Sequence, residues 1–139
     1  MVRTRLDTVV TVKERVEERA GQALARAESV VSSAQARAEE ARRVAAQDNR
    51  MRADVSQWEV TELAHHRALV DARRAQRELE SAQRTASSAR DQYLSAHRAA
   101  EVVRRVADNR REETARELNR LEDKALDEAA GLLFVRKAG

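Results

Sequence analysis

The sequence predicts an all-α protein, an antiparallel two-helix coiled-coil hairpin whose second helix is the longer. The 139 residues contain no proline and only three glycines, so few positions would interrupt a helix. Alanine, arginine, glutamate, leucine and glutamine dominate the composition, and these are strong helix formers. Apolar residues recur at steps of three and four, as they do in coiled coils. We therefore expect one coiled-coil rod over residues 1–139.

The first helix is expected over about residues 4–51. Thr4, followed three residues later by Asp7, can form a capping box at its start. Two apolar rows follow at heptad spacing, the first broken by Lys13 and the second by Arg37. The first row is Leu6, Ala20, Ala27, Ala34 and Ala41, the second is Val9, Val16, Ala23, Val30, Val44 and Met51, and Val10, Leu24 and Val31 widen the stripe. Gly21, inside this helix, indicates a close helix approach or a slight bend.

The helical pattern weakens over residues 46–58, where several residues favour turns and helix caps. These residues are Asp48, Asn49, Asp54 and Ser56. Ser56 and Glu59, three positions apart, form a second candidate capping box. We expect the chain to reverse its direction at about residues 52–56.

The second helix is expected over about residues 57–131, with Gly131 ending it and a tail over 132–139. Its apolar row is Ala72, Ala75, Leu79, Ala82, Ala86, Ala89, Tyr93, Ala96, Ala100, Val103 and Ala107, continued with a change of phase by Leu118, Leu121, Ala125, Ala129 and Leu132. In this arrangement Asp127 and Glu128 lie in the last turn, where a helix prefers cations. Such a departure from a local rule is typical of a functional contact.

The two expected helices differ in length, about 47 against about 75 residues, or roughly 70 and 110 Å. Folding the chain back at about residue 54 brings Leu6 to about residue 102. Residues beyond about 105 are then expected to project as an unpaired helix. This extension carries Leu118, Leu121 and Leu126, which have no expected partner within the chain and therefore indicate an interface.

Several function classes find little support in the sequence. The three glycines provide no phosphate-binding loop, and no nucleophile, base and orienting group can be assembled into a catalytic site on a two-helix rod. The adjacent histidines His65 and His66 point about 100° apart on a helix, which argues against a metal chelate, and no cofactor is expected. There is no cysteine, no apolar run of the roughly 18 residues that a membrane span needs, and no sign of a signal peptide.

The net charge is +3, but acids and bases are interleaved, which is typical of a solvated helix face. The most basic segment, Arg104-Arg105 to Arg110-Arg111, is diluted by Asp108 and two glutamates. A nucleic-acid-binding basic helix would lack these acids. We therefore expect neither a nucleic acid nor a small-molecule substrate as a partner.

Trp58 is the only tryptophan and is expected at the tip of the hairpin. One interpretation is a packing residue that fixes the turn. The other is an exposed interaction residue, because tryptophan is enriched among residues that dominate binding. Leu63, Leu69 and Val70 follow it at spacings that share one helix face.

The two ends of the sequence resemble the FliJ family of flagellar export proteins, related to the stalk proteins of type III secretion systems. The resemblance rests on the start, from Leu6-Asp7 to Ala20, and on the run Arg120-Leu121-Glu122-Asp123-Lys124-Ala125-Leu126-Asp127-Glu128. Trp58, the chain length and the long second helix also fit. The high content of alanine and arginine departs from the family pattern.

The resemblance implies a cytoplasmic, non-catalytic stalk at the inner face of the membrane. Such a stalk enters the hexameric export ATPase and contacts the membrane export gate and export chaperones. Carried over, the ATPase-binding residues would be Arg5, Leu6, Leu118, Arg120, Leu121, Lys124, Asp127 and Glu128. The export-gate-binding residues would be Trp58, Leu63, His66 and Leu69. We expect a monomeric hairpin.

Two other functions are open from the sequence alone. The chain fits a structural coiled coil that homodimerises to cover its alanine stripes. A basic helical rod that binds nucleic acid is less well supported, and an enzyme is the least supported class.

Overall fold

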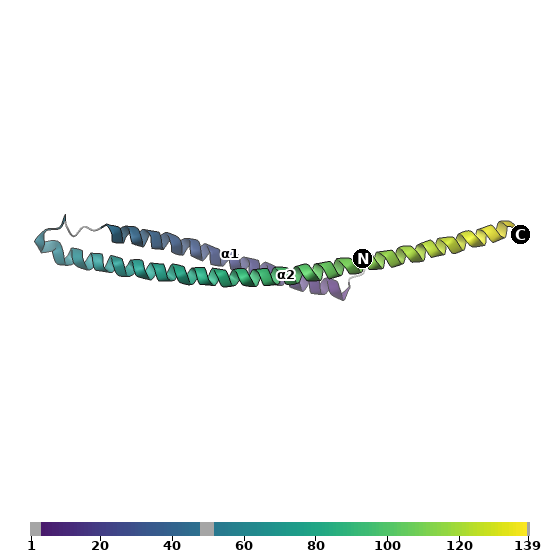
Figure 1. Ribbon diagram of the computed structural model, residues 1–139, viewed down its shortest axis with the longest axis horizontal. Coiled ribbons are helices and arrows are strands. Elements are labelled where there is room, and N and C mark those ends of the chain that lie inside the picture. The colour runs from purple at the N-terminus through teal and green to yellow at the C-terminus, as the bar shows by residue number, and fades with distance from the viewer. Residues whose placement is uncertain (1–3, 48–51, 139) are drawn as a thin grey trace. The chain divides into compact units, whose positions relative to one another are not determined.

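The computed structural model describes residues 4–47 and 52–138 and contains two long α-helices. Helix α1 spans Arg5–Ala46, the short 3-10 helix η2 spans Val55–Gln57, and α2 spans Trp58–Ala138 (Figure 1). No β-strand occurs in the described ranges. The predicted all-α hairpin with a longer second helix is therefore confirmed.

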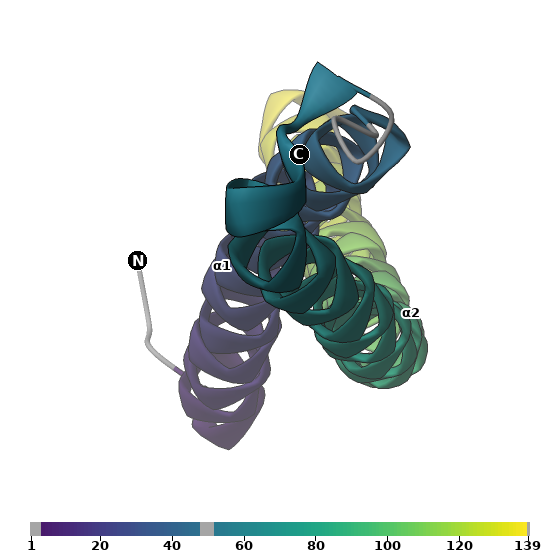
Figure 2. The ribbon, with the colours of Figure 1, turned by 90° about the vertical axis from the view of Figure 1, so that its left-hand side faces the viewer.

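By its internal contacts the chain divides into two compact units. The hairpin unit is Val16–Ala96, and the terminal unit combines Met1–Arg15 with His97–Gly139. Each unit contains part of α1 and part of α2. Within the hairpin unit these two parts lie side by side, as both ribbon views show (Figures 1 and 2). The single rod over residues 1–139 remains a prediction.

The start of α1 forms one half of the predicted capping box, the bond from the Thr4 backbone to the Asp7 carboxylate. The backbone N–H of Thr4 donates to Oδ2 of Asp7 at 2.9 Å, and the Thr4 hydroxyl donates to the same oxygen at 3.2 Å. The N–H of Asp7 in turn donates to the carbonyl of Thr4 at 3.0 Å. The carboxylate therefore satisfies a backbone donor that the first turn would otherwise leave unpaired.

The first helix ends earlier than expected. Its last residue is Ala46 rather than a residue near 51, and Gln47 already lies outside it. The next two residues, Asp48 and Asn49, are poor helix formers, which accounts for the early end. Residues 48–51, including Met51 of the predicted apolar row, lie outside the described residues.

The predicted capping box of Ser56 and Glu59 is wrong, because Ser56 lies inside η2 and no described hydrogen bond joins either side chain to the backbone of the other residue. Asp54 precedes η2, and its carbonyl accepts the N–H of Gln57 at 2.9 Å. Helix α2 then begins at Trp58, one residue from the expected start.

The second helix continues through Gly131 to Ala138, so the expected tail over 132–139 is wrong for its described part. No described glycine has a positive φ, and Gly131 therefore keeps a helical backbone between strong helix formers. Asp127 and Glu128 consequently lie well before the last turn, and the acids do not oppose the helix dipole. That turn instead carries Arg136 and Lys137, the charge that a helix C-terminus prefers.

The core of the hairpin unit consists of small residues. Ala34, Ala38, Leu79 and Ala82 form one buried cluster, with Val31 and Ala75 packed against it. The first predicted row of α1 and the predicted α2 row from Ala72 to Ala107 are buried or half-buried in their units, as expected. The second predicted row is wrong as a core row, because Val30 is 54% exposed and Val44 is 45% exposed.

Ala38, which is 0% exposed, occupies the place that was expected for that second row. Val30 and Val44 lie at the edge of the helix contact. Because the alanine side chains beside them are small, the outer faces of the two valines remain in solvent. Gly21 faces Tyr93 of α2 without requiring a close approach of the helices. A Cβ atom placed there would lie 3.5 Å from Cε2 of Tyr93.

Candidate functional site

Polar pairs between α1 and α2 fix how the helices are aligned. In the hairpin unit, Arg90 lies 3.7 Å from Glu28, and Nη2 of Arg42 donates to Oε1 of Gln76 at 3.4 Å. In the terminal unit, Arg104 lies 3.1 Å from Glu14, and Arg111 lies 2.6 Å from Asp7. The two residue numbers add to 118 in each of these pairs, which defines an antiparallel register.

The register corrects where pairing ends. Asp7 contacts Arg111, so the expected position of Leu6 near residue 102 is wrong. By the same relation Ala46, the last residue of α1, lies across from about residue 72. The paired part of α2 therefore begins only after its first turns, and each residue of α1 faces a later residue of α2 than expected. The paired part of the terminal unit reaches about residue 111 rather than about 105.

Residues 112–138 of α2 form a single helix, which we call the overhang. Every one of these residues is exposed, and no second helix of the terminal unit accompanies this yellow segment in Figure 1. Most of the side chains predicted to bind an ATPase lie on it, all exposed: Leu118, Arg120, Leu121, Lys124, Asp127 and Glu128.

One row along the overhang repeats at steps of three and four. The row is Leu118, Leu121, Ala125, Glu128, Leu132 and Val135. Leu121 is 64% exposed, and the other large apolar members are similarly open. An apolar row of this kind favours contact with a partner, and Glu128 places one carboxylate within it.

The remaining predicted ATPase-binding residues lie at the base of the overhang. Arg5 is the first residue of α1 and is exposed, and Leu6 is half-buried. The contact of Asp7 with Arg111 brings this helix start beside the residue that precedes the overhang. Glu128 lies 17 positions beyond Arg111, or about 25 Å along a helix. The structure thus brings Arg5 and Leu6 near the base of the overhang and leaves Glu128 distant from them.

The predicted export-gate residues all lie in the first turns of α2 and are exposed. Trp58 is 54% exposed, so part of its side chain is open to a partner, and its role in fixing the turn stays a prediction. Leu63 is 70% exposed, and His66 and Leu69 are also exposed. Val60, which the sequence had not suggested, shares a helix face with Leu63 and Val70. The spacing of three and seven residues was the signal that would have identified it.

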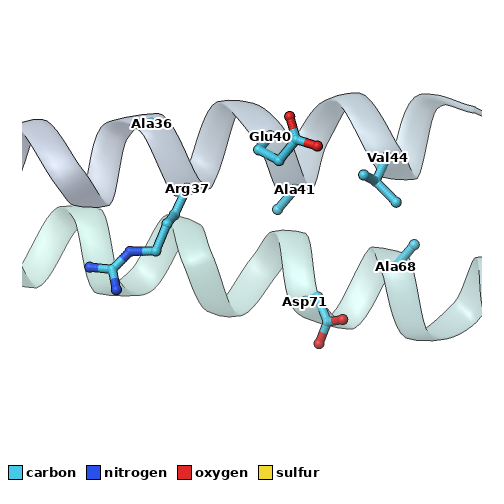
Figure 3. Close-up of a pocket in the computed structure, with 7 residues that line it drawn as sticks. All are labelled: Ala36, Arg37, Glu40, Ala41, Val44, Ala68 and Asp71. Atoms are coloured by element: carbon cyan, nitrogen blue, oxygen red, sulfur yellow. The ribbon is translucent and has the colours of Figure 1, made fainter.

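An apolar groove lies between the two helices of the hairpin unit, on the side opposite to the contacts of Glu28 and Arg42. Around the axis of α1, its central residue Arg37 is about 200° away from those two residues. The groove contains two open hollows between the helices, and Arg37 lines both. Figure 3 shows the first hollow, with Ala41, Val44 and Ala68 between the helices. The second is lined by Ala27, Val30, Ala34, Arg37, Glu78, Ser81, Ala82 and Thr85. We call this surface the valine groove.

Among the described residues, no group of three or more histidine, cysteine, aspartate or glutamate side chains could hold a metal ion. Nδ1 of His65 is buried without a hydrogen-bond partner in the described structure, while the residue as a whole is half-buried. The pKa of Asp7 is lowered, mainly by the hydrogen bond from the Thr4 backbone and then by Arg111.

The basic segment is also partly neutralised. Arg104 contacts Glu14 and Glu101, and Arg111 contacts Asp7 and Asp108. This pairing leaves fewer cations to face phosphates than the sequence alone indicates. None of the described helices is both long and apolar enough to span a membrane.

A two-helix coiled coil with open hollows and an exposed single-helix extension defines a class of protein that acts through protein contacts. The family model described as "Flagellar FliJ protein" matches residues 1–139, the whole length of the chain. The chain belongs to this FliJ family, and membership of the family implies a component of the flagellar export apparatus. No curated protein and no solved structure matches it in the same comparisons.

Proposed function

We propose that the chain is the central stalk of the flagellar or a related type III export apparatus. In this role it inserts into the hexameric export ATPase and promotes assembly and hydrolysis, without chemistry of its own. The observation that supports this most is the overhang, which offers an exposed leucine row and interleaved charges on one helix. In this proposal the overhang is the surface through which the stalk contacts the ATPase ring.

A physical argument supports this mechanism. A single helix or hairpin in a six-fold ring cannot touch six subunits equally. It therefore binds some subunit states better than others, and such differential binding shifts their equilibrium. The exposed leucines would supply apolar contact, while Arg120, Lys124 and Asp127 would supply exchangeable polar contacts.

Truncation of the overhang tests this proposal. The full chain should raise ATP hydrolysis by the export ATPase of the same organism, and a chain that ends after residue 117 should not. A chain that ends after residue 131 is the matched control, because it keeps Leu118 to Glu128 and should still stimulate. Stimulation that survives removal of everything after residue 117 would contradict the proposed site.

The exposed residues at the start of α2 are the proposed contact for the export gate. Trp58, Leu63, His66 and Leu69 lie in the hairpin unit and belong to different contact surfaces from the overhang. Alanine at Trp58 and Leu63 should weaken binding to the isolated cytoplasmic part of the gate while leaving ATPase stimulation unchanged. If gate binding and ATPase stimulation are lost together, the variant has a folding defect, and the result does not support a gate contact.

We also propose that export chaperones bind the monomeric hairpin, which works at the cytoplasmic face of the inner membrane. Co-sedimentation with inner-membrane vesicles that contain the export gate, compared with vesicles that lack it, tests the location. Binding that is equal in both vesicle types would argue against a gate-dependent location.

A further inference from the structure

The overhang and the valine groove have matching patterns. In the groove, Val30 and Val44 lie seven positions before and after Arg37. On the overhang, Leu121 and Val135 lie seven positions before and after Glu128. Seven residues are close to two helical turns, or about 10.5 Å, in both segments. Each surface therefore has an apolar residue on either side of a central charge, and the two central charges are opposite. The groove also contains Glu40, Asp71 and Glu78, so Arg37 is the cation among its lining residues.

We propose that the overhang of one molecule docks in the valine groove of a second copy of this chain. Glu128 of one copy then contacts Arg37 of the other, with the leucine row seated against the half-exposed valines. A second copy is required because α2 is one continuous helix that forms a wall of the groove and also carries the overhang. The apolar residues lie seven positions on either side of the central charge in both surfaces. The docked helix can therefore run parallel or antiparallel to α1.

The central charges make this pairing selective. A carboxylate within an apolar row is costly to bury unless a cation meets it. Arg37 forms no ion pair among the described residues, whereas Glu78 beside it already contacts Arg74 at 3.4 Å. A guanidinium can bind a carboxylate through two parallel hydrogen bonds. Arg37 is thus the available cation at the position where Glu128 would lie.

This contact goes beyond the proposed function and does not depend on it. If the overhang also enters the ATPase, the same leucines and Glu128 cannot serve both contacts at once. Association between copies would then cover the apolar row at high protein concentration, and the ring would compete with it. One helix docked in one groove buries little apolar area, so the contact is weak. We expect a dissociation constant of about 10–100 µM.

Sedimentation equilibrium of the full chain between about 5 and 500 µM tests the proposal. The wild type should associate reversibly, while Arg37→Glu and Glu128→Arg should each weaken association about tenfold or more, because like charges then meet. An equimolar mixture of the two variants should associate nearly as well as the wild type. In the mixture, opposite charges meet again, because the two reversed side chains face each other in one contact and the two unaltered ones do so in the other.

Matched controls place the same charge changes elsewhere. Arg77→Glu alters an exposed position of α2 that is turned about 200° from the buried Leu79, and Asp123→Arg alters a face of the overhang away from the leucine row; both should associate like the wild type. The proposal is overturned if the wild type remains monomeric at about 500 µM, if the mixture associates no better than its components, or if the controls weaken association equally. Circular dichroism in the far ultraviolet checks that every variant keeps its helix content.

Discussion

Nη2 of Arg111 lies 2.6 Å from Oδ1 of Asp7, so one ion pair joins residues that are 104 positions apart in the sequence. Asp7 is also the residue that caps the start of α1 through Thr4. The same carboxylate therefore begins one helix and attaches it to the other. Both contacts of Asp7 therefore act on the first turn of α1 in the terminal unit.

Replacing Arg111 with glutamine should release the start of α1 from α2 without removing the cap. We expect faster amide hydrogen exchange at the first turns of α1 and unchanged exchange around Ala38. Asp7→Asn should have a larger effect, because it removes the ion pair and weakens the cap together. Equal exchange in wild type and both variants would show that the pair contributes nothing measurable.

The lowered pKa of Asp7 predicts a dependence on pH. The hydrogen bond from Thr4 and the Arg111 guanidinium favour the ionised carboxylate, so its pKa in the folded state lies below the unfolded value of about 3.9. The stability that the folded state gains from this lowered pKa is present above the unfolded pKa. It is lost as the pH falls through the folded pKa. A carboxyl titration by NMR should give a midpoint below that unfolded value, raised in Arg111→Gln. A wild-type midpoint at or above it would contradict the assignment.

The alanine core should not tolerate a larger side chain. Ala38 is fully buried between the helices, so Ala38→Leu forces them apart and should lower the free energy of unfolding by about 1–3 kcal/mol. Ala25→Leu, at an exposed position of the same helix, is the control and should change it little. Urea denaturation followed by circular dichroism measures both. Equal midpoints for the two variants would indicate that the helices separate readily at Ala38.

Gly131 offers the opposite case. A Cβ atom added there would meet nothing within 4 Å, so Gly131→Ala should stabilise the helix by about 1 kcal/mol. We expect slower hydrogen exchange on both sides of residue 131. Gly21→Ala, whose new Cβ would make an ordinary contact with Tyr93, should also stabilise the protein. A loss of helix content in Gly131→Ala would contradict the continuous helix.

Asp127 and Glu128 are predicted to contact the export ATPase. Because both residues lie inside α2 rather than in its last turn, reversing their charges should leave the helix content unchanged. Asp127→Lys combined with Glu128→Lys should weaken ATPase binding by about tenfold if basic residues of the ring face them. Surface plasmon resonance with the assembled ring measures this. Unchanged affinity would mean that the two acids are only part of a solvated face.

The contact rows were the most predictable part of the fold, because heptad spacing identifies which side of a helix is apolar. Ala27, Ala34 and the α2 row from Ala72 were found in this way. The position of Ala38 was not, since Arg37 beside it was interpreted as a break in a valine row. Spacing alone cannot distinguish the central line of a stripe from its edge; that choice depends on how the second helix packs.

The ends of the helices and their register were less predictable. Gly131 suggested a helix end, yet its neighbours are strong helix formers and the helix continues. The register depends on which charged residues meet across the pair, and the sequence contains many interleaved candidates. The exposed face at Leu118 was predicted correctly, because it follows from the unpaired extension of the longer helix. The exposure of Leu63 was left open by the sequence, together with the role of Trp58; it follows from the register and from the end of α1 at Ala46.

The small core has one further consequence. Most layers of the core are alanine, and Leu79 and the contact of Tyr93 with Gly21 are the larger features that mark one alignment. A displacement of one helix by a whole heptad would therefore change few core layers. Moving α2 by seven residues would place Gln83 across from Glu28 in the hairpin unit, and Arg90 would lose its partner. The choice between alternative alignments therefore depends on the few large core residues and also on side chains on the surface. Substitutions there, which in most proteins change little, would here alter which residues of the two helices face each other.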